Sequence, residues 1–244
     1  MTATPEADRY GTSTVTANRL GRTGTTLNEI NEAFVAFAAT ADGPVLDIGC
    51  AYGIAARAAL AAGATVVAND VGLDHLTGLA ERCPPEDRER LRLVQGHFPR
   101  DLSFRPGSLA AVHAANLLNF LTGEEIAAGV ADLHAWLRPG GRVFVISATP
   151  YANNIRGFIE TYERRRDAGE PWPGFCERLK DYSDDPTMDE LPEWLHLLDD
   201  AVLRRVFEAA GFRVELAEMF HRRNTPGYIA LDGRENVRLI AVKD

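Results

Sequence analysis

Two carboxylates and a glycine-bearing turn are the residues whose types and spacing could do chemistry. Residues 47–53 read Asp-Ile-Gly-Cys-Ala-Tyr-Gly and continue a short apolar run. Gly49 and Gly53 permit a sharp turn and a close approach between backbone and ligand. Asp70 follows Asp47 after a stretch whose length fits one helix and one strand. This pattern predicts a ligand site at the carboxyl end of a parallel sheet.

The elements that must position these residues alternate between strands and helices. The predicted strands are short apolar runs over residues 45–48, 65–68, 91–94, 108–114, 143–146, 212–216 and 237–242. Runs that are apolar throughout are typical of a parallel sheet covered on both faces. The last two runs fit a closing antiparallel hairpin with a long loop. We therefore predict an α/β fold with a seven-stranded, mostly parallel sheet, helices on both faces and an antiparallel last strand.

Two segments lie outside this alternation. Residues 1–40 begin irregularly and continue into an amphipathic helix, for which Thr26 and Glu29 fit a capping box. We expect this segment to form a lid on the main domain, residues 41–244. Within that domain, residues 148–195 show no obvious strand and are too long for a plain loop. They carry the large aromatic side chains Trp172, Phe175, Tyr182 and Trp194. We expect them to form an inserted helical substrate cap.

Composition and charge exclude several classes of function. The chain has 244 residues and a formal net charge of -9, which disfavours binding to nucleic acid or to an anionic membrane surface. No apolar run reaches the roughly 18 residues of a spanning helix, and the first residues lack a basic and apolar leader. The three cysteines match neither a disulfide framework nor a zinc-site spacing. We expect a cytoplasmic protein without a metal.

The glycine turn distinguishes between two kinds of nucleotide cofactor. A dinucleotide fingerprint, Gly-x-Gly-x-x-Gly, fails here because Ala51 and Ile54 occupy its second and third glycine positions. The turn instead resembles motif I of the class I S-adenosylmethionine-dependent methyltransferases, which is written acidic-x-Gly-x-Gly-x-Gly. Residues 66–70 resemble motif II of that family, and residues 137–146 resemble its Leu-x-Pro-Gly-Gly-strand motif.

The resemblance covers residues 45–147 well and residues 198–242 in outline. It implies a Rossmann-like fold, S-adenosylmethionine as the cofactor and a small-molecule acceptor. Asp70 would bind the ribose, because a carboxylate accepts two hydrogen bonds from a vicinal diol. His97 stands where the family often has an acid facing the adenine amine. The implied cofactor-binding residues are Asp47, Gly49, Ala51, Gly53, Asp70, His97, Phe98, Asn116 and Leu117, with Arg19 for the methionine carboxylate.

The reaction implied is methyl transfer to an oxygen or nitrogen atom of a small metabolite. The aromatic residues of 148–195 favour an apolar or aromatic acceptor. A hydroxyl or ammonium acceptor would have to lose a proton, and the candidate bases are His196 and Tyr151; either could equally be structural. A carboxylate acceptor would need no base. Two alternatives remain: a protein that binds S-adenosylmethionine with little turnover, and an NAD-dependent oxidoreductase.

Overall fold

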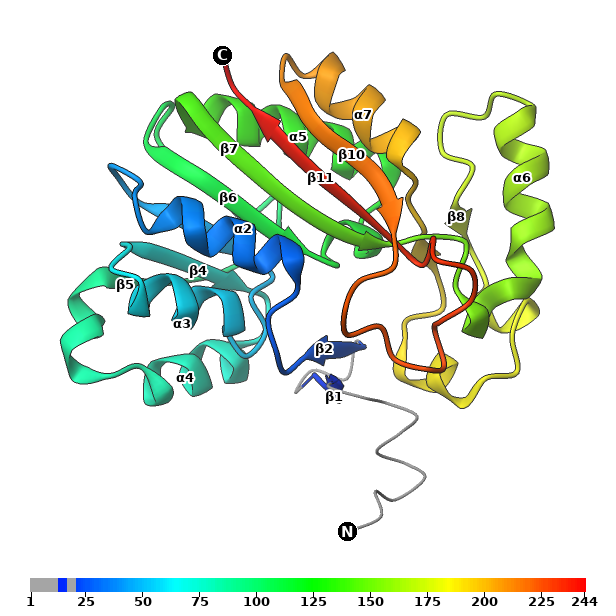
Figure 1. The fold of residues 1–244 in the computed structure, drawn as a ribbon, viewed down its shortest axis with the longest axis horizontal. Helices are drawn as coiled ribbons and strands as arrows, with labels where there is room; N and C mark the ends of the chain where they lie inside the picture. Colours follow the sequence, from blue (N-terminus) through cyan, green and yellow to red (C-terminus); the bar gives the residue numbers. More distant parts are fainter. Residues whose placement is uncertain (1–12, 17–20) are drawn as a thin grey trace, which may run out of the picture.

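A seven-stranded sheet runs through the centre of the computed structural model, which describes residues 13–16 and 21–244 (Figure 1). The strand order is β10-β11-β7-β6-β3-β4-β5. The mutually parallel strands are β3 (Val45–Ile48), β4 (Val66–Asp70), β5 (Leu91–Gln95), β6 (Leu109–Ala115) and β7 (Leu137–Ala148). The closing strands are β10 (Arg213–Phe220) and β11 (Asn236–Val242), and β11 is antiparallel to both β10 and β7. This arrangement confirms the predicted fold.

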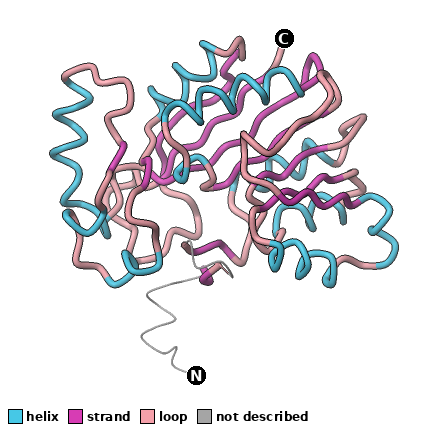
Figure 2. The backbone as a smooth tube through the Cα atoms, turned by 180° about the vertical axis from the view of Figure 1, so that it is seen from behind, coloured by secondary structure: helices cyan, strands magenta, loops and turns pink. Residues whose placement is uncertain are grey.

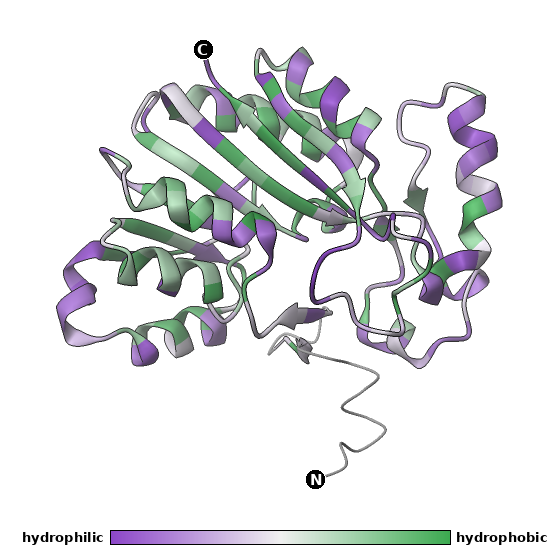
Figure 3. Ribbon diagram, viewed as in Figure 1, coloured by the Kyte–Doolittle hydropathy of each residue, from purple (hydrophilic) through white to green (hydrophobic). Residues whose placement is uncertain are grey.

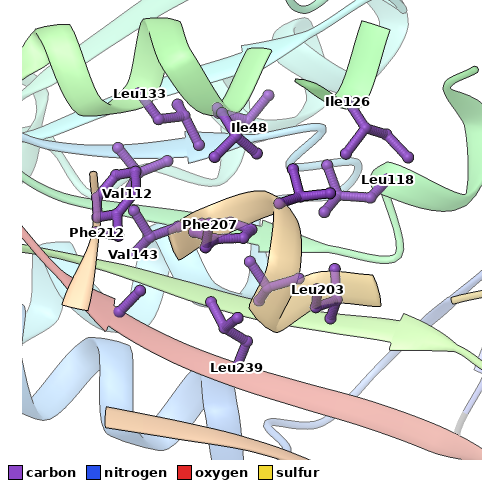
Figure 4. Close-up of a cluster of buried hydrophobic side chains, with 14 of the residues drawn as sticks. Ile48, Val112, Leu118, Ile126, Leu133, Val143, Leu203, Phe207, Phe212 and Leu239 are labelled. Atoms are coloured by element: carbon purple, nitrogen blue, oxygen red, sulfur yellow. The ribbon is translucent and has the colours of Figure 1, made fainter. Parts of the chain in front are cut away.

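Helices cover both faces of the sheet (Figures 1 and 2). One face packs against α2 (Glu29–Ala38), α3 (Ile54–Ala61) and α4 (Leu73–Arg82). The other packs against α5 (Gly123–Trp136) and α7 (Asp200–Ala209). Figure 4 shows the second of these cores, where Phe207 of α7 lies among side chains of the sheet and of α5. Both faces of the sheet are therefore dry, which explains why its inner strands are mostly apolar.

Reciprocal capping boxes fix where two of these helices, α2 and α5, begin. Thr122 and Glu125 form the reciprocal capping box at the start of α5. The box predicted for α2 was wrong in its position: the N-cap is Asn28, and its partner is Asn31. The physical reason is that Asn is as strong an N-cap as Thr. The Asn31 amide oxygen also accepts the Asn28 backbone N–H, as a glutamate would.

Residues 148–195 form a small unit beside the sheet. It contains α6 (Ile159–Asp167), whose residues are largely hydrophilic (Figure 3), and β8 (Phe175–Cys176), which pairs antiparallel with β9 (Leu195–His196). The expectation of no strand was therefore wrong, because two-residue strands leave no periodic signal. Short 3₁₀ segments lie at Pro85–Arg90, Leu118–Phe120, Asn153–Phe158, Leu179–Asp181 and Pro186–Glu190.

The ends of this unit meet at the sheet. The Leu198 backbone N–H donates to the Ala148 carbonyl at 3.0 Å. The Asn119 amide donates to the Ala148 carbonyl at 3.1 Å and to the His196 carbonyl at 2.7 Å. We call residues 149–197 the insert from here on. A single asparagine thus holds both ends of the insert against the main domain.

The described part of the N-terminal segment is a hairpin and not an irregular stretch. Its strands are β1 (Ser13–Val15) and β2 (Arg22–Gly24), which pair antiparallel. Figure 1 shows them beside the loop between β10 and β11. The Tyr52 hydroxyl donates to the Val15 carbonyl at 3.1 Å, which ties the hairpin to the turn after β3. No helix among residues 13–16 and 21–244 is long and apolar enough to cross a bilayer.

Candidate active site

Two adjoining cavities open where the parallel strands end. The main cavity, about 330 Å³, lies against the ends of β3, β4 and β6. The side cavity, about 140 Å³, lies between the insert, the hairpin β1–β2 and the loop between β10 and β11. The residues that line both are Ser13, Arg22, Thr23, Gly24, Asn116, Phe120 and Arg222. The two cavities therefore adjoin along this shared wall.

The turn after β3 shapes the floor of the main cavity. Gly49 has a φ of 64°, and a Cβ there would lie 3.1 Å from Leu117 Cδ1. Gly53 has a φ of 70°, and a Cβ would come within 2.5 Å of Leu79 Cδ1. Gly53 does not line the cavity; it lets α3 pack against α4. Ala51, where the motif has glycine, adopts a φ of 47°, a conformation that costs a non-glycine residue roughly 1 kcal/mol or more.

Asp70, at the end of β4, ties two turns together. Its Oδ2 accepts the Ala51 backbone N–H at 2.9 Å. Its Oδ1 accepts the Gly72 N–H at 2.8 Å and lies 2.9 Å from His75 Nδ1. The carboxylate is buried and lines the main cavity. Since Oδ2 has one protein donor, it keeps capacity for a further hydrogen bond from a ligand.

A buried chain of polar side chains runs from Asp47 to α2. Asp47 and His113 are register partners on neighbouring parallel strands, and His113 Nδ1 lies 2.7 Å from Asp47 Oδ1. His113 Nε2 lies 2.9 Å from Asn31 Nδ2. Because the Asn31 oxygen already accepts the Asn28 N–H, the Asn31 amide nitrogen is the donor to Nε2. His113 therefore donates from Nδ1 to Asp47 and has no lone pair left for a substrate proton.

The end of β5 supplies the other wall of the main cavity. The Asn69 amide donates to the carbonyls of Val94 and Gly96 at 3.0 and 2.9 Å, which fixes the turn before His97. The His97 backbone N–H donates to Asp101 Oδ2 at 2.9 Å. His97 Nδ1 is buried and has no hydrogen-bond partner. A buried ring nitrogen without a partner favours a polar ligand atom at this place.

The main cavity brings together most of the residues that the sequence predicts for cofactor binding. Those that line it are Asp47, Gly49, Ala51, Asp70, His97, Phe98, Asn116 and Leu117. The ring of Phe98 also packs edge-on against Trp136, with centroids 6.3 Å apart. Gly53 lies behind the cavity wall. Arg19 lies outside the described residues.

The two candidate bases line neither cavity. His196 is buried between the rings of Trp172 and Phe175, at 5.1 and 5.5 Å, and its Nδ1 lies 3.1 Å from the Leu121 carbonyl oxygen. Burial lowers the pKa of His196 to about 4. His196 was predicted as a base, but it lines neither cavity. The reason is that β9 pairs with β8, and this pairing turns the His196 side chain into the packing of the insert.

Tyr151 is likewise held inside the insert. Its hydroxyl donates to Glu163 Oε1 at 3.1 Å and accepts from Arg166 at 3.1 Å. The Arg234 guanidinium lies over its ring, 3.5 Å from the centroid. Burial, followed by the bond to Glu163, raises the pKa of Tyr151. The hydroxyl therefore stays protonated and engaged, away from both cavities.

The aromatic residues of the insert do not line the side cavity either. Trp172 packs against Gly123 and beneath Arg205, and Tyr182 packs against Phe158 at 5.0 Å. Trp194 lines the main cavity. The side cavity is lined on its apolar side by Phe120, Ala148, Ala152, Ile155, Leu179, Met188, Leu191, Leu195, Leu197, Pro226 and Ile229. Its apolar surface is thus mainly aliphatic.

The acidic side chains of the side cavity are engaged with protein donors. Glu190 accepts two hydrogen bonds from Arg22, at 3.1 and 2.9 Å. Glu235 Oε1 accepts three backbone N–H groups from residues 231–233, and its Oε2 lies 2.9 Å from His221 Nδ1. Burial alone would raise the pKa of Glu235, but these bonds lower it to about 2.

Two donors in the side cavity lack a partner. Arg222 Nε is buried without a hydrogen bond, and none of the described residues forms an ion pair with this guanidinium. Asn236 Nδ2 is also buried without a partner. Neither residue was predicted from the sequence. Arg222 follows a strand in an irregular loop, and such a loop has no diagnostic spacing. His75 was missed too, although its spacing from Asp70 and Gly72 places it in the first turn of the next helix.

The comparisons with known proteins agree with this geometry. Residues 45–141 match the family model described as a methyltransferase domain. The chain carries a class I S-adenosylmethionine-dependent methyltransferase domain. The cofactor of the domain is therefore S-adenosylmethionine, and the oxidoreductase alternative is set aside. A comparison with curated protein sequences finds no match.

Solved methyltransferase structures share the fold of the domain at low sequence identity. An S-adenosylmethionine-dependent methyltransferase from Mesorhizobium loti aligns with a TM-score of 0.61 and 17% identity over 87% of this chain and 95% of that chain. One from Methanosarcina mazei aligns at 0.63 and 16%, over 89% and 98%. The glycopeptide N-methyltransferase MtfA, in complex with S-adenosyl-L-homocysteine, aligns at 0.59 and 18%, over 88% of each chain.

Proposed function

We propose that the main cavity binds S-adenosylmethionine and that a small molecule in the side cavity accepts the methyl group on an oxygen or nitrogen atom. The observation that carries this proposal is the shared wall of Asn116, Phe120 and Arg222, where the two cavities meet. The bound cofactor supplies an electrophilic methyl group. The protein holds the acceptor beside it, and this positioning is the main contribution to rate.

The residues present fit the cofactor. Asp70 would bind the ribose hydroxyls through the remaining acceptor capacity of Oδ2. His97 would meet the adenine through its buried Nδ1. The methionine part would lie at Gly49, where a side chain would crowd Leu117, and near Asp47 and Asn116, which line the same cavity.

We propose that the hairpin β1–β2 acts as the lid and the insert as the acceptor cap. The hairpin supplies Arg22, Thr23 and Gly24 to both cavities. Deleting residues 1–24 would open both cavities, and we expect it to weaken cofactor affinity. Unchanged affinity would overturn the lid assignment. The aliphatic lining of the side cavity supports an acceptor with an apolar body.

Calorimetric titration with S-adenosylhomocysteine tests the cofactor site. We expect micromolar binding to the wild-type protein and at least roughly tenfold weaker binding to Asp70→Asn, which disrupts one charge-assisted hydrogen bond or more. Asp74→Asn is the matched control, because Asp74 is exposed on the next helix. A parallel titration with NADH should give no binding.

Either of two outcomes would contradict the proposal. Wild-type protein that fails to bind S-adenosylhomocysteine would remove the cofactor site. Equal affinities of Asp70→Asn and Asp74→Asn would remove Asp70 from it. Strong cofactor binding without methyl transfer to any acceptor would favour the alternative of a binding protein with little turnover.

A further inference from the structure

Arg222 is a half-buried cation whose Nε atom is fully buried and has no hydrogen-bond partner. It lines both cavities, and none of the described residues forms a hydrogen bond or an ion pair with its guanidinium. Glu29 and Tyr228 act on it electrostatically but do not bond to it. Burial lowers the pKa of Arg222, although an arginine remains charged at neutral pH. A charged group whose buried donor has no partner is costly to folding, and its position at both cavities favours an anionic ligand.

The side cavity offers no group to remove a proton from an acceptor. Its described lining contains no histidine. Glu190 is engaged by Arg22, and Glu235 by three backbone N–H groups and His221. Burial raises the pKa of Tyr228, so its hydroxyl is protonated at neutral pH. The chemistry that suits this cavity is attack by a nucleophile that is already deprotonated in solution.

A carboxylate satisfies both conditions. It is ionised at neutral pH, and it pairs with a guanidinium in a favourable planar geometry. We propose that the methyl acceptor is a small carboxylic acid, that Arg222 binds its carboxylate where the two cavities meet, and that the product is a methyl ester. This inference rests on the proposed function. It narrows the acceptor atom to a carboxylate oxygen.

The reaction balances without a base. A carboxylate oxygen forms a bond to the methyl carbon, and the bond between that carbon and sulfur breaks. The electron pair of the broken bond stays on sulfur, so the sulfonium and carboxylate charges disappear together. No proton is released. Asn236 Nδ2, the other buried donor without a partner in the side cavity, offers a further hydrogen bond to the body of the acceptor.

Neutral analogues of simple acids provide the test. Protein loaded with S-adenosylhomocysteine is titrated with benzoate and hexanoate, and with benzamide and hexanamide, which have nearly the same shape. We expect the acids to bind at least about tenfold more tightly than the amides. Arg222→Gln should remove this preference while S-adenosylhomocysteine affinity stays within about twofold. Arg223→Gln, which changes an exposed neighbour paired with Glu32, should keep it.

A product assay and a melting curve accompany the titration. Incubation with methyl-labelled S-adenosylmethionine and benzoate or hexanoate should give a product that releases labelled methanol in alkali, as esters do and ethers and amines do not. Without ligand, Arg222→Gln should melt no lower than the wild type. A clearly lower melting temperature would mean that Arg222 serves to neutralise Glu29, and would overturn the inference.

Two further results would also overturn it. One is equal binding of acids and amides to the loaded wild-type protein. The other is a tenfold loss of S-adenosylhomocysteine affinity in Arg222→Gln, with the affinity for methylthioadenosine unchanged. That pattern would assign Arg222 to the cofactor's own carboxylate, which methylthioadenosine lacks. Failure of the wild-type protein to bind S-adenosylhomocysteine at all would refute the proposed function instead.

Discussion

The two cavities differ in how their buried polar groups are satisfied. In the main cavity, Asp47 and Asp70 are bonded to protein donors, and His113 links Asp47 to α2. Arg222, on the wall shared by both cavities, and Asn236, in the side cavity, present donors that none of the described residues accepts. The two carboxylates of the main cavity are thus held by the protein itself, and its unsatisfied groups are His97 Nδ1 and the shared Arg222. The side cavity holds unsatisfied donors, so a ligand that accepts their hydrogen bonds removes the cost of leaving them unpaired and binds more tightly.

The largest effect should come from breaking the polar chain of the main cavity. His113→Leu removes the partner of Asp47 Oδ1 and leaves a buried carboxylate with a single backbone donor. We expect the free energy of unfolding to fall by about 3 kcal/mol. Urea denaturation at neutral pH measures this change. A loss below about 1 kcal/mol would mean that the hydrogen bonds between Asp47, His113 and Asn31 contribute little to stability, and that the two cavities do not differ in this respect.

Glu235 lies in the side cavity, but its carboxylate resembles those of the main cavity, because both of its oxygens are bonded to protein groups. Its pKa is lowered from 4.5 to about 2 in the folded protein. Its contribution to stability is therefore complete above pH 4.5 and is lost as the pH falls toward 2. We expect Glu235→Gln to lose about 2 kcal/mol at pH 7, and the difference from wild type to shrink in acid. A difference independent of pH would contradict this account.

A smaller effect is expected at the strained turn of the main cavity. Ala51→Gly relieves a positive φ but adds backbone freedom to the unfolded chain. The net gain in the free energy of unfolding should be about 0.5 kcal/mol. Ala58→Gly, in the interior of α3, is the control and should lose about 1 kcal/mol. If both variants lose stability equally, the turn is not strained.

The smallest effect should come from an apolar exchange in the side cavity. Asn236→Leu removes a buried donor without a partner, and the cavity beside it has room for the larger side chain. We expect the free energy of unfolding to change by less than about 0.5 kcal/mol. The contrast with His113→Leu, measured by the same denaturation, is the direct comparison of the two cavities. If both variants lose a similar free energy of unfolding, the two cavities do not differ in how much their polar groups stabilise the fold.

The sequence predicts the main cavity better than the side cavity, and for a physical reason. The turn after β3 and the acid that ends β4 depend on local periodicity and on glycine positions, which one sequence displays. The pairing of Asp47 with His113 depends on strand register, and a single sequence does not display strand register. His196 and Tyr151 looked like bases because they lie near predicted strand ends. Their side chains are turned away by the packing of the insert, which has little periodic pattern.

The position of Arg222 shows the same limit in another way. Its loop connects two strands that are predictable, but the path of the loop depends on the hairpin β1–β2 and the insert, which pack beside it. Thr26 and Glu29 illustrate a smaller error, in which the right motif was placed two residues early. The aromatic residues of the insert were expected to line an acceptor cap, but of these only Trp194 lines a cavity, the main one.

The Asn119 clamp has a consequence for how this chain can be rebuilt. Because the insert leaves and re-enters the main domain at two backbone positions that bond directly to each other, it behaves as a cassette with adjacent ends. A segment of different length could occupy the same junction without displacing β7 or α7. Protein engineering thus has a ready point at which to exchange the insert while the sheet and its covering helices stay intact.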